Sequence, residues 1–173
     1  MPPRPADASS TRVTPKVLVV LAALLLAARV ALEAMAAIAP PPVVERVTWQ
    51  AAETALDDSR SNRKPVLYLF TADWSEASRR MQREVLADRR AANVFDQLFI
   101  PVKVIDRQRE AGRNPIDVAA LEARYGVTEF PTVVIVDPRG SDPVVIAGYP
   151  GKQKLLERIT AAGVKNRLAP RVR

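Results

Sequence analysis

The chain has 173 residues, of which 48% are hydrophobic, and a formal net charge of +7 at pH 7. This length allows one domain with an appendage, and the hydrophobic fraction can supply a packed core, so disorder throughout the chain is excluded. The sequence contains neither cysteine nor histidine. Zinc fingers, Ser-His-Asp triads and Cys-His nucleophiles therefore cannot be assembled from this chain alone, although the absence of cysteine identifies no redox compartment.

The N-terminal part has the pattern of a membrane-targeting segment. Residues 1–16 are polar and rich in proline, and we expect a disordered segment on the cytoplasmic side. Residues 17–28 form an unbroken apolar run with an alanine-rich continuation to position 39. We interpret residues 17–39 as a transmembrane signal anchor that crosses the inner membrane once, because spanning takes about 20 helical residues. Positive residues before the run orient the following domain toward the periplasm.

A cleaved signal peptide is the alternative interpretation of the same segment. The apolar run has a suitable length, and Ala34-Met35-Ala36 offers small residues for cleavage. Arg29 and Glu33 lie four positions apart, so in an anchor they can pair on one helix face and snorkel toward the interface. In a signal peptide they lengthen the stretch between the apolar core and the cleavage site. Both interpretations put the folded domain in the periplasm, either anchored or released.

The first half of the domain is predicted to alternate strands and helices. Residues 40–46 are rich in proline and predict a stiff linker, so we expect the domain to begin at Val47. The apolar patterns predict a short edge strand over 47–49, a helix over 51–61, a buried strand over 66–71, and then helices over 78–86 and 88–97 and a strand over 98–105. Pro101 places the last strand at a sheet edge, or itself near the strand's start. Residues 107–114 predict a long polar loop.

The second half adds a helix, a hairpin and a final helix. The helix begins at residue 115 or 116 and ends at Tyr125, where Gly126 supplies the terminating position. Strands over 132–137 and 144–147 form the hairpin, and a helix over 152–162 ends the domain at about residue 163. Residues 164–173 are a basic tail. The side chains expected to face the core from the helices are Ala52, Ala55, Leu56, Val94, Phe95, Val118, Leu121, Tyr125, Leu155, Leu156 and Ile159.

Two motifs carry a resemblance to a known family. The sequence ADWSEAS at residues 72–78 resembles the thioredoxin active site, A-[DE]-W-C-x-x-C, with serine at both cysteine positions, Ser75 and Ser78. The sequence YGVTEFPT at residues 125–132 resembles the family segment whose proline is cis and faces that turn. Residues 47–163 thus resemble the thioredoxin-like superfamily, in particular the C-terminal thioredoxin-like domain of membrane thiol:disulfide interchange proteins.

The resemblance implies a fold and, at the same time, a lost activity. The expected fold is an α/β thioredoxin fold, a three-layer α/β/α sandwich with a mixed central sheet, preceded by one N-terminal hydrophobic helix. Thiol-disulfide oxidoreductase activity is predicted to be absent, because a serine hydroxyl ionises far above a thiol and forms no disulfide. Leu69 also occupies the position of the buried aspartate of many thioredoxins. This favours natural loss; the alternative is an engineered or degenerate thiol:disulfide interchange protein.

The two serines allow one structural and two catalytic interpretations. We expect Ser75 to cap the following helix, which serine does well. The enzyme alternatives are a serine-dependent reaction with Asp73, Glu76 or a lysine as base, or a transferase-like site that binds a thiol ligand, as in glutathione transferases. We predict no cofactor and no metal site, because carboxylates such as Asp73, Glu76 and Asp88 are usually solvated at a surface.

The predicted binding groove consists of Trp74, Ser75, Glu76, Phe130, Pro131 and Thr132. In redox-active relatives this groove holds extended client peptide beside the proline, and a cis Phe130–Pro131 bond would leave the backbone N–H and C=O of Phe130 free for such a strand. We therefore expect a membrane-tethered, non-redox module that binds a protein or an extended peptide. The alternative is that Trp74 and Phe130 only complete the packing around the turn.

The positive charge has two interpretations. Arginines cluster over residues 79–90 and 107–113, and the last ten residues carry four basic and no acidic side chains. These basic residues are either ordinary solvated surface residues or a site by which the domain is attracted to an anionic bilayer. Nucleic acid is not an expected partner, because no aromatic residues alternate with the basic ones.

Overall fold

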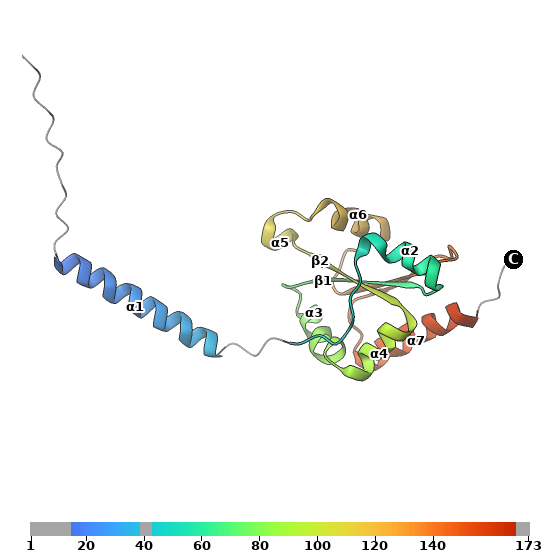
Figure 1. Ribbon diagram of the computed structural model, residues 1–173, viewed down its shortest axis with the longest axis horizontal. Helices are drawn as coiled ribbons and strands as arrows, with labels where there is room; N and C mark the ends of the chain where they lie inside the picture. The colour runs from blue at the N-terminus through green and yellow to red at the C-terminus, as the bar shows by residue number, and fades with distance from the viewer. Residues whose placement is uncertain (1–14, 39–42, 169–173) are drawn as a thin grey trace, which may run out of the picture. The chain divides into compact units, whose positions relative to one another are not determined.

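The computed structural model describes residues 15–38 and 43–168, and the chain divides between residues 42 and 43 into two units (Figure 1). The first unit contains helix α1 (Pro15–Ile38), whose leucine and valine side chains between residues 17 and 32 are exposed. Within the described part of the chain, no helix is long and apolar enough to cross a membrane. The expectations for residues 1–14, for the start of the linker at 40–42 and for the end of the basic tail at 169–173 lie outside the described residues.

The second unit is built on a four-stranded mixed sheet with the order β2-β1-β3-β4. The central strand β1 (Val66–Ala72) runs parallel to β2 (Ile100–Asp106) and antiparallel to β3 (Thr132–Val136), which pairs antiparallel with β4 (Val144–Ala147). All but one residue of β1 are buried, as expected for a continuous apolar strand covered on both faces. Pro101 lies in the edge strand β2, one residue after its start, which agrees with the sequence prediction.

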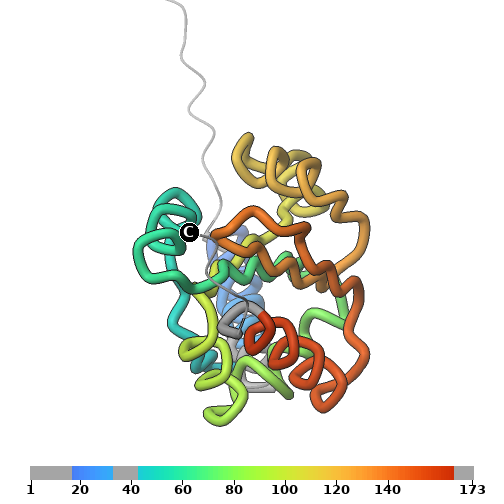
Figure 2. Tube along the Cα trace, turned by 90° about the vertical axis from the view of Figure 1, so that its right-hand side faces the viewer, coloured from blue at the N-terminus to red at the C-terminus, as the bar shows by residue number. Residues whose placement is uncertain are grey.

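Helices cover both faces of this sheet (Figure 1). One face carries α2 (Ala52–Asn62) and α6 (Ile116–Tyr125), and the other carries α3 (Glu76–Met81), α4 (Arg89–Leu98) and α7 (Lys152–Leu168). In Figure 2 the red helix α7 lies with the yellow-green α4 on the same side of the strands. The three-layer α/β/α sandwich with a mixed sheet is therefore confirmed.

Two hydrophobic clusters fill the layers, one on each face of the sheet. Tyr68 and Phe70 of β1 point into the cluster under α2 and α6, while Leu67 and Leu69 point into the cluster under the other helices. This division follows from the alternation of side chains along a strand. Every helix residue predicted to face the core belongs to one of the two clusters or packs against it.

The predicted edge strand over residues 47–49 is wrong. This segment meets the sheet only through a single bridge between Gln50 and Val102. Its backbone groups bond elsewhere: the Thr48 N–H donates to a carboxylate oxygen of Asp96 at 3.0 Å, and the Arg46 N–H donates to the Leu86 carbonyl at 2.7 Å. The residues 43–46 assigned to the linker therefore bond to the domain in the compact unit that begins at Val43.

Two helices differ from their predicted extents by more than one residue, and a third helix was not predicted. The helix after the turn begins at Glu76 and changes at Gln82 into a π-helical segment, η1 (Gln82–Leu86). The polar loop contains a short helix, α5 (Gln108–Ala111). Helix α7 continues to Leu168, into the part assigned to the basic tail.

Candidate functional site

Ser75 connects the turn after β1 to the proline loop before β3. It caps α3: the Ser78 N–H donates to Ser75 Oγ at 3.3 Å, and the Arg79 N–H donates to the Ser75 carbonyl at 3.1 Å. The Ser75 hydroxyl donates in turn to the Phe130 carbonyl at 2.7 Å. The predicted cap is confirmed, and the same oxygen also joins two loops that are 55 positions apart.

The proline loop lies against this turn as expected. The Phe130–Pro131 peptide bond is cis, and the Phe130 ring meets the Trp74 ring edge-on with centroids 5.8 Å apart. Trp74 and Phe130 are half-buried, whereas Pro131 is buried. One expectation changes, because the Phe130 carbonyl already accepts the Ser75 hydroxyl and is not free for a client strand. Its second lone pair is the acceptor capacity that remains.

The other two predicted groove residues lie apart from the aromatic contact. Thr132 is buried in β3, and its hydroxyl donates to the Glu129 carbonyl at 2.8 Å. Glu76 is exposed and accepts hydrogen bonds from Arg79 at 2.7 Å and from Arg83 at 2.9 Å. These bonds, that from Arg79 first, lower the pKa of the Glu76 carboxyl. The accessible apolar part of the groove is therefore the pair Trp74 and Phe130.

Neither serine has the surroundings of a nucleophile. Ser78 is buried, and its Oγ accepts a long hydrogen bond of 3.5 Å from the Ala72 N–H. The Ser75 proton goes to a carbonyl oxygen, which is no base for proton abstraction. Asp73, one of the candidate bases, forms an ion pair with Arg107 at 2.7 Å. Within residues 43–168 the geometry therefore fits a structural role for both hydroxyls.

Comparison with known proteins agrees with this architecture. Residues 52–163 match the profile of the family described as "Thioredoxin-like domain". The chain belongs to this family. It is 26% identical over 118 residues to the "Disulfide bond reductase DsbH" of Chlamydia pneumoniae, a match that covers 64% of this chain and 69% of that protein.

Solved structures show the same fold. A structure titled "DsbH Oxidoreductase" superposes with a TM-score of 0.60 at 23% identity, covering 76% of this chain and 92% of that one. The oxidised C-terminal domain of Neisseria meningitidis DsbD gives a TM-score of 0.50 at 24% identity, covering 65% and 95%. The predicted resemblance to the C-terminal domain of a thiol:disulfide interchange protein is confirmed at the level of the fold. The absence of cysteine means that this member of the family has no redox CxxC.

A partly buried polar cluster beside Trp74, centred on the buried Asp106, escaped the sequence analysis. The Trp74 Nε1–H donates to Asp106 at 3.4 Å, and the Asn114 amide donates both to Asp106 at 2.6 Å and to Glu122 at 2.9 Å. Burial, and next the charge of Asp106, raise the pKa of Glu122, while the bond from Asn114 lowers it. Asp106 ends β2 beside the turn because β2 is parallel to β1. The sequence signal that could have predicted this cluster was Asp106, a polar residue at the carboxyl end of a strand parallel to β1.

A second set of polar contacts, centred on Glu45, lies near the serine turn and was also not predicted from the sequence. Lys103 of β2 lies beside Leu69 of β1 in the strand register, and its Nζ is 2.6 Å from a carboxylate oxygen of Glu45. Glu45 also accepts from Trp49 Nε1 at 2.7 Å and from Gln82 at 2.9 Å. Glu45 and Lys103 border a small cavity of about 20 Å³ together with Ser78. Glu45 thus places a carboxylate from the N-terminal segment at the edge of this cavity.

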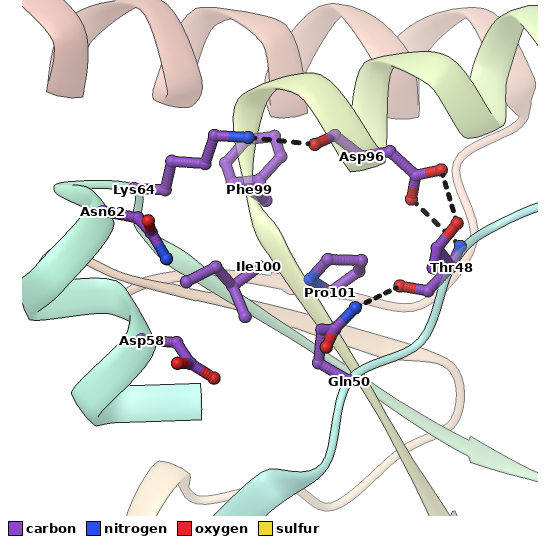
Figure 3. A pocket seen from close by; sticks show the side chains of 9 residues that line it. All are labelled: Thr48, Gln50, Asp58, Asn62, Lys64, Asp96, Phe99, Ile100 and Pro101. Atoms are coloured by element: carbon purple, nitrogen blue, oxygen red, sulfur yellow. Dashed lines mark hydrogen bonds between the residues drawn. The ribbon is translucent and has the colours of Figure 1, made fainter. Parts of the chain in front are cut away.

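A separate open pocket of about 540 Å³ lies at the other end of the sheet (Figure 3). Its lining residues are Thr48, Gln50, Asp58, Asn62, Lys64, Asp96, Phe99, Ile100 and Pro101. Several of its polar groups bond to one another; Lys64 Nζ, for example, donates to the Asp96 carbonyl at 3.2 Å. The pocket is at the amino ends of β1 and β2, whereas the serine turn follows the carboxyl end of β1. It is therefore not part of the groove.

Replacing Ser75 with alanine is expected to destabilise the domain by about 1–2 kcal/mol, since it removes a helix cap and the bond to Phe130. Urea unfolding followed by circular dichroism measures the change. Ser61→Ala is the matched control, because Ser61 is an exposed residue near the end of α2. Equal stability of the two variants would contradict the structural role of the Ser75 hydroxyl.

Proposed function

We propose that this chain is a non-redox thioredoxin-like module that binds a protein or an extended peptide in the groove of Trp74, Ser75, Glu76, Phe130, Pro131 and Thr132. The observation that carries the proposal is the bond from Ser75 to Phe130. It uses the former thiol position to join the walls of the groove, while the two aromatic rings beside it stay half-exposed. A fixed apolar platform of this kind suits recognition of a chain segment.

The similarity to these relatives supports the proposed binding of a partner, but it does not support disulfide reduction by this chain. The protein from Chlamydia pneumoniae is named a disulfide bond reductase, an activity that requires a reactive thiolate. Ser75 and Ser78 cannot provide one. What this chain shares with such proteins is the fold with its proline loop and aromatic turn, and we infer that client recognition outlasted the redox step.

The proposed location is the extracytoplasmic side of the inner membrane, with residues 17–39 as a single-pass anchor or as a signal segment that is removed. Basic residues before an apolar run support this orientation. The exposed leucine and valine side chains of α1 support burial of that helix in another apolar environment. N-terminal sequencing of the protein recovered from the membrane fraction distinguishes anchor from signal peptide, and recovery from the cytosol would contradict both.

The groove is tested with the variant Trp74→Ala/Phe130→Ala in the full-length protein. Partners cross-linked in membranes and quantified by mass spectrometry are expected to fall at least about fivefold with this variant, because the apolar platform is gone. The control is Val144→Ala/Val145→Ala, which trims two exposed apolar side chains on the edge strand β4.

One result of comparing the groove variant with the β4 variant would contradict the groove proposal. If the groove variant recovers the same partners as the wild type while the β4 variant loses them, binding lies at the sheet edge and the groove proposal is wrong. Circular dichroism on both variants confirms that the domain is folded before partners are compared.

A further inference from the structure

Arginines surround the rim of the groove. Four exposed guanidinium groups contact the turn or its tryptophan, from Arg79, Arg83, Arg107 and Arg109. Two exposed carboxylates face them there: Asp73 pairs with Arg107 at 2.7 Å, and Glu76 pairs with Arg79 and Arg83. The buried Asp106 is used by Trp74 and Asn114. At these contacts, four guanidinium groups meet two exposed carboxylates that pair with them.

Arg109 differs from the other rim arginines. Its guanidinium carbon lies 3.5 Å from the centroid of the Trp74 ring, and among the described residues no carboxylate pairs with it. Stacking on an aromatic face uses the flat side of the guanidinium and leaves its N–H edge for a ligand. A carboxylate that approaches in this plane can accept two parallel hydrogen bonds.

The segment that carries Arg109 is closed on itself. The Arg107 N–H donates to Asn114 Oδ1 at 2.6 Å, and the Gln108 amide donates to the Gly112 carbonyl at 3.1 Å. The ion pair between Arg107 and Asp73 ties the start of the segment to the serine turn. Arg109 is therefore positioned before a ligand arrives, so less side-chain entropy is lost when it binds.

We propose that the stacked pair of Trp74 and Arg109 is a subsite for the carboxylate of an acidic residue in an extended peptide, whose neighbouring apolar side chain packs on Phe130. This inference rests on the proposed function and names the chemistry of its partner. Charge complementarity selects an acidic segment, because the other exposed cations of the rim already have acidic partners. An anionic membrane is a poorer match, since attraction to its surface grows with the number of unpaired basic residues.

The test uses the full-length protein in detergent and three fluorescein-labelled seven-residue peptides. They share a valine-rich sequence and differ only in a central glutamate, glutamine or lysine. Fluorescence anisotropy is expected to give a Kd about tenfold lower for the glutamate peptide than for the glutamine peptide, and added salt should shrink the difference. Arg109→Gln should remove the preference and leave the affinity for the glutamine peptide within about twofold. Arg109→Glu should make the lysine peptide the tightest of the three.

Arg113→Gln is the matched control, because it removes one positive charge from the same segment and leaves the contact between Arg109 and Trp74 in place. It should keep most of the preference for glutamate; equal loss in Arg113→Gln and Arg109→Gln would assign the effect to general charge and overturn the subsite. Equal affinity of the wild type for the glutamate and glutamine peptides would also overturn it and leave the proposed function standing. Failure of all three peptides to bind would contradict both proposals. Arg109-dependent binding to anionic vesicles, with no peptide preference, would replace the peptide by a lipid phosphate.

Discussion

The double variant Ser75→Cys/Ser78→Cys is expected to form an intramolecular disulfide and to reduce insulin with dithiothreitol, whereas the protein itself gives no turnover above background. The two side chains lie three positions apart at one helix start: the Ser78 N–H reaches Ser75 Oγ at 3.3 Å, and both residues are buried on the same turn. Cysteines at this spacing can bring their Cβ atoms within the roughly 3.5–4.5 Å that a disulfide needs.

The measurement is the mass of the full-length variant after alkylation, with and without prior reduction. Each single variant, Ser75→Cys or Ser78→Cys, is the control and should take up one alkyl group in either condition. Cross-links found only between molecules would show that the turn is not built as described. Turnover by the protein without cysteine would disprove its redox inactivity.

Turnover of the double variant is expected to be modest. Leu69 is fully buried and offers no proton acceptor on β1. Glu45 borders the small cavity beside Ser78, but its carboxylate is already used by Lys103, Trp49 and Gln82. Recovery of the cross-link is therefore the test of the turn, and the rate of insulin reduction reports how well this group replaces the missing acid.

The parts of the fold that the sequence predicted depend on local patterns. The apolar run of β1, the helical stripes and the two motifs at residues 72–78 and 125–132 each show themselves within a short window. They were enough for the order of the four strands and of helices α2, α4, α6 and α7, and for the contact between the serine turn and the proline loop. They were also enough for Ser75 as a cap, since capping depends on the residue and the three positions that follow it.

The parts that failed depend on partners distant in sequence. The strand predicted at residues 47–49 satisfied the local pattern, but Asp96, 48 positions after Thr48, takes its backbone N–H. The occupied Phe130 carbonyl follows from a bond across 55 positions. Arg109 was visible only as one arginine in a polar loop, because its place over Trp74 depends on the closure of residues 107–114. A single sequence does not show which residues distant along the chain form such contacts.

Loss of the Glu45 carboxylate is expected to have the largest effect on stability among the variants considered. Glu45→Ala leaves the Lys103 ammonium, whose side chain is 21% exposed, without its counter-charge, and it also removes the acceptor of the Trp49 indole and the Gln82 amide. Breaking one side of a buried pair costs about 3–5 kcal/mol, and partial solvent access places this pair near the lower value. A loss of about 3 kcal/mol is a large fraction of the roughly 5–15 kcal/mol by which domains of this size are stable.

Urea unfolding of four proteins separates the charge pair from the rest of the group: the wild type, Glu45→Gln, Lys103→Met and the double variant. Glutamine keeps an acceptor for Trp49, so the single variants report mainly the loss of the ion pair. The double variant should be more stable than the sum of the two single losses predicts, because it leaves no charge unpaired. Asp57→Asn is the control, since its pair with Arg60 is exposed and should contribute less than about 1 kcal/mol. If Glu45→Gln costs no more than Asp57→Asn and the cycle is additive, the group under the turn does not hold residues 43–50 to the domain. A clear excess would establish that the Glu45 carboxylate, in addition to the backbone bonds of Arg46 and Thr48, helps to hold this segment, which has no strand of its own.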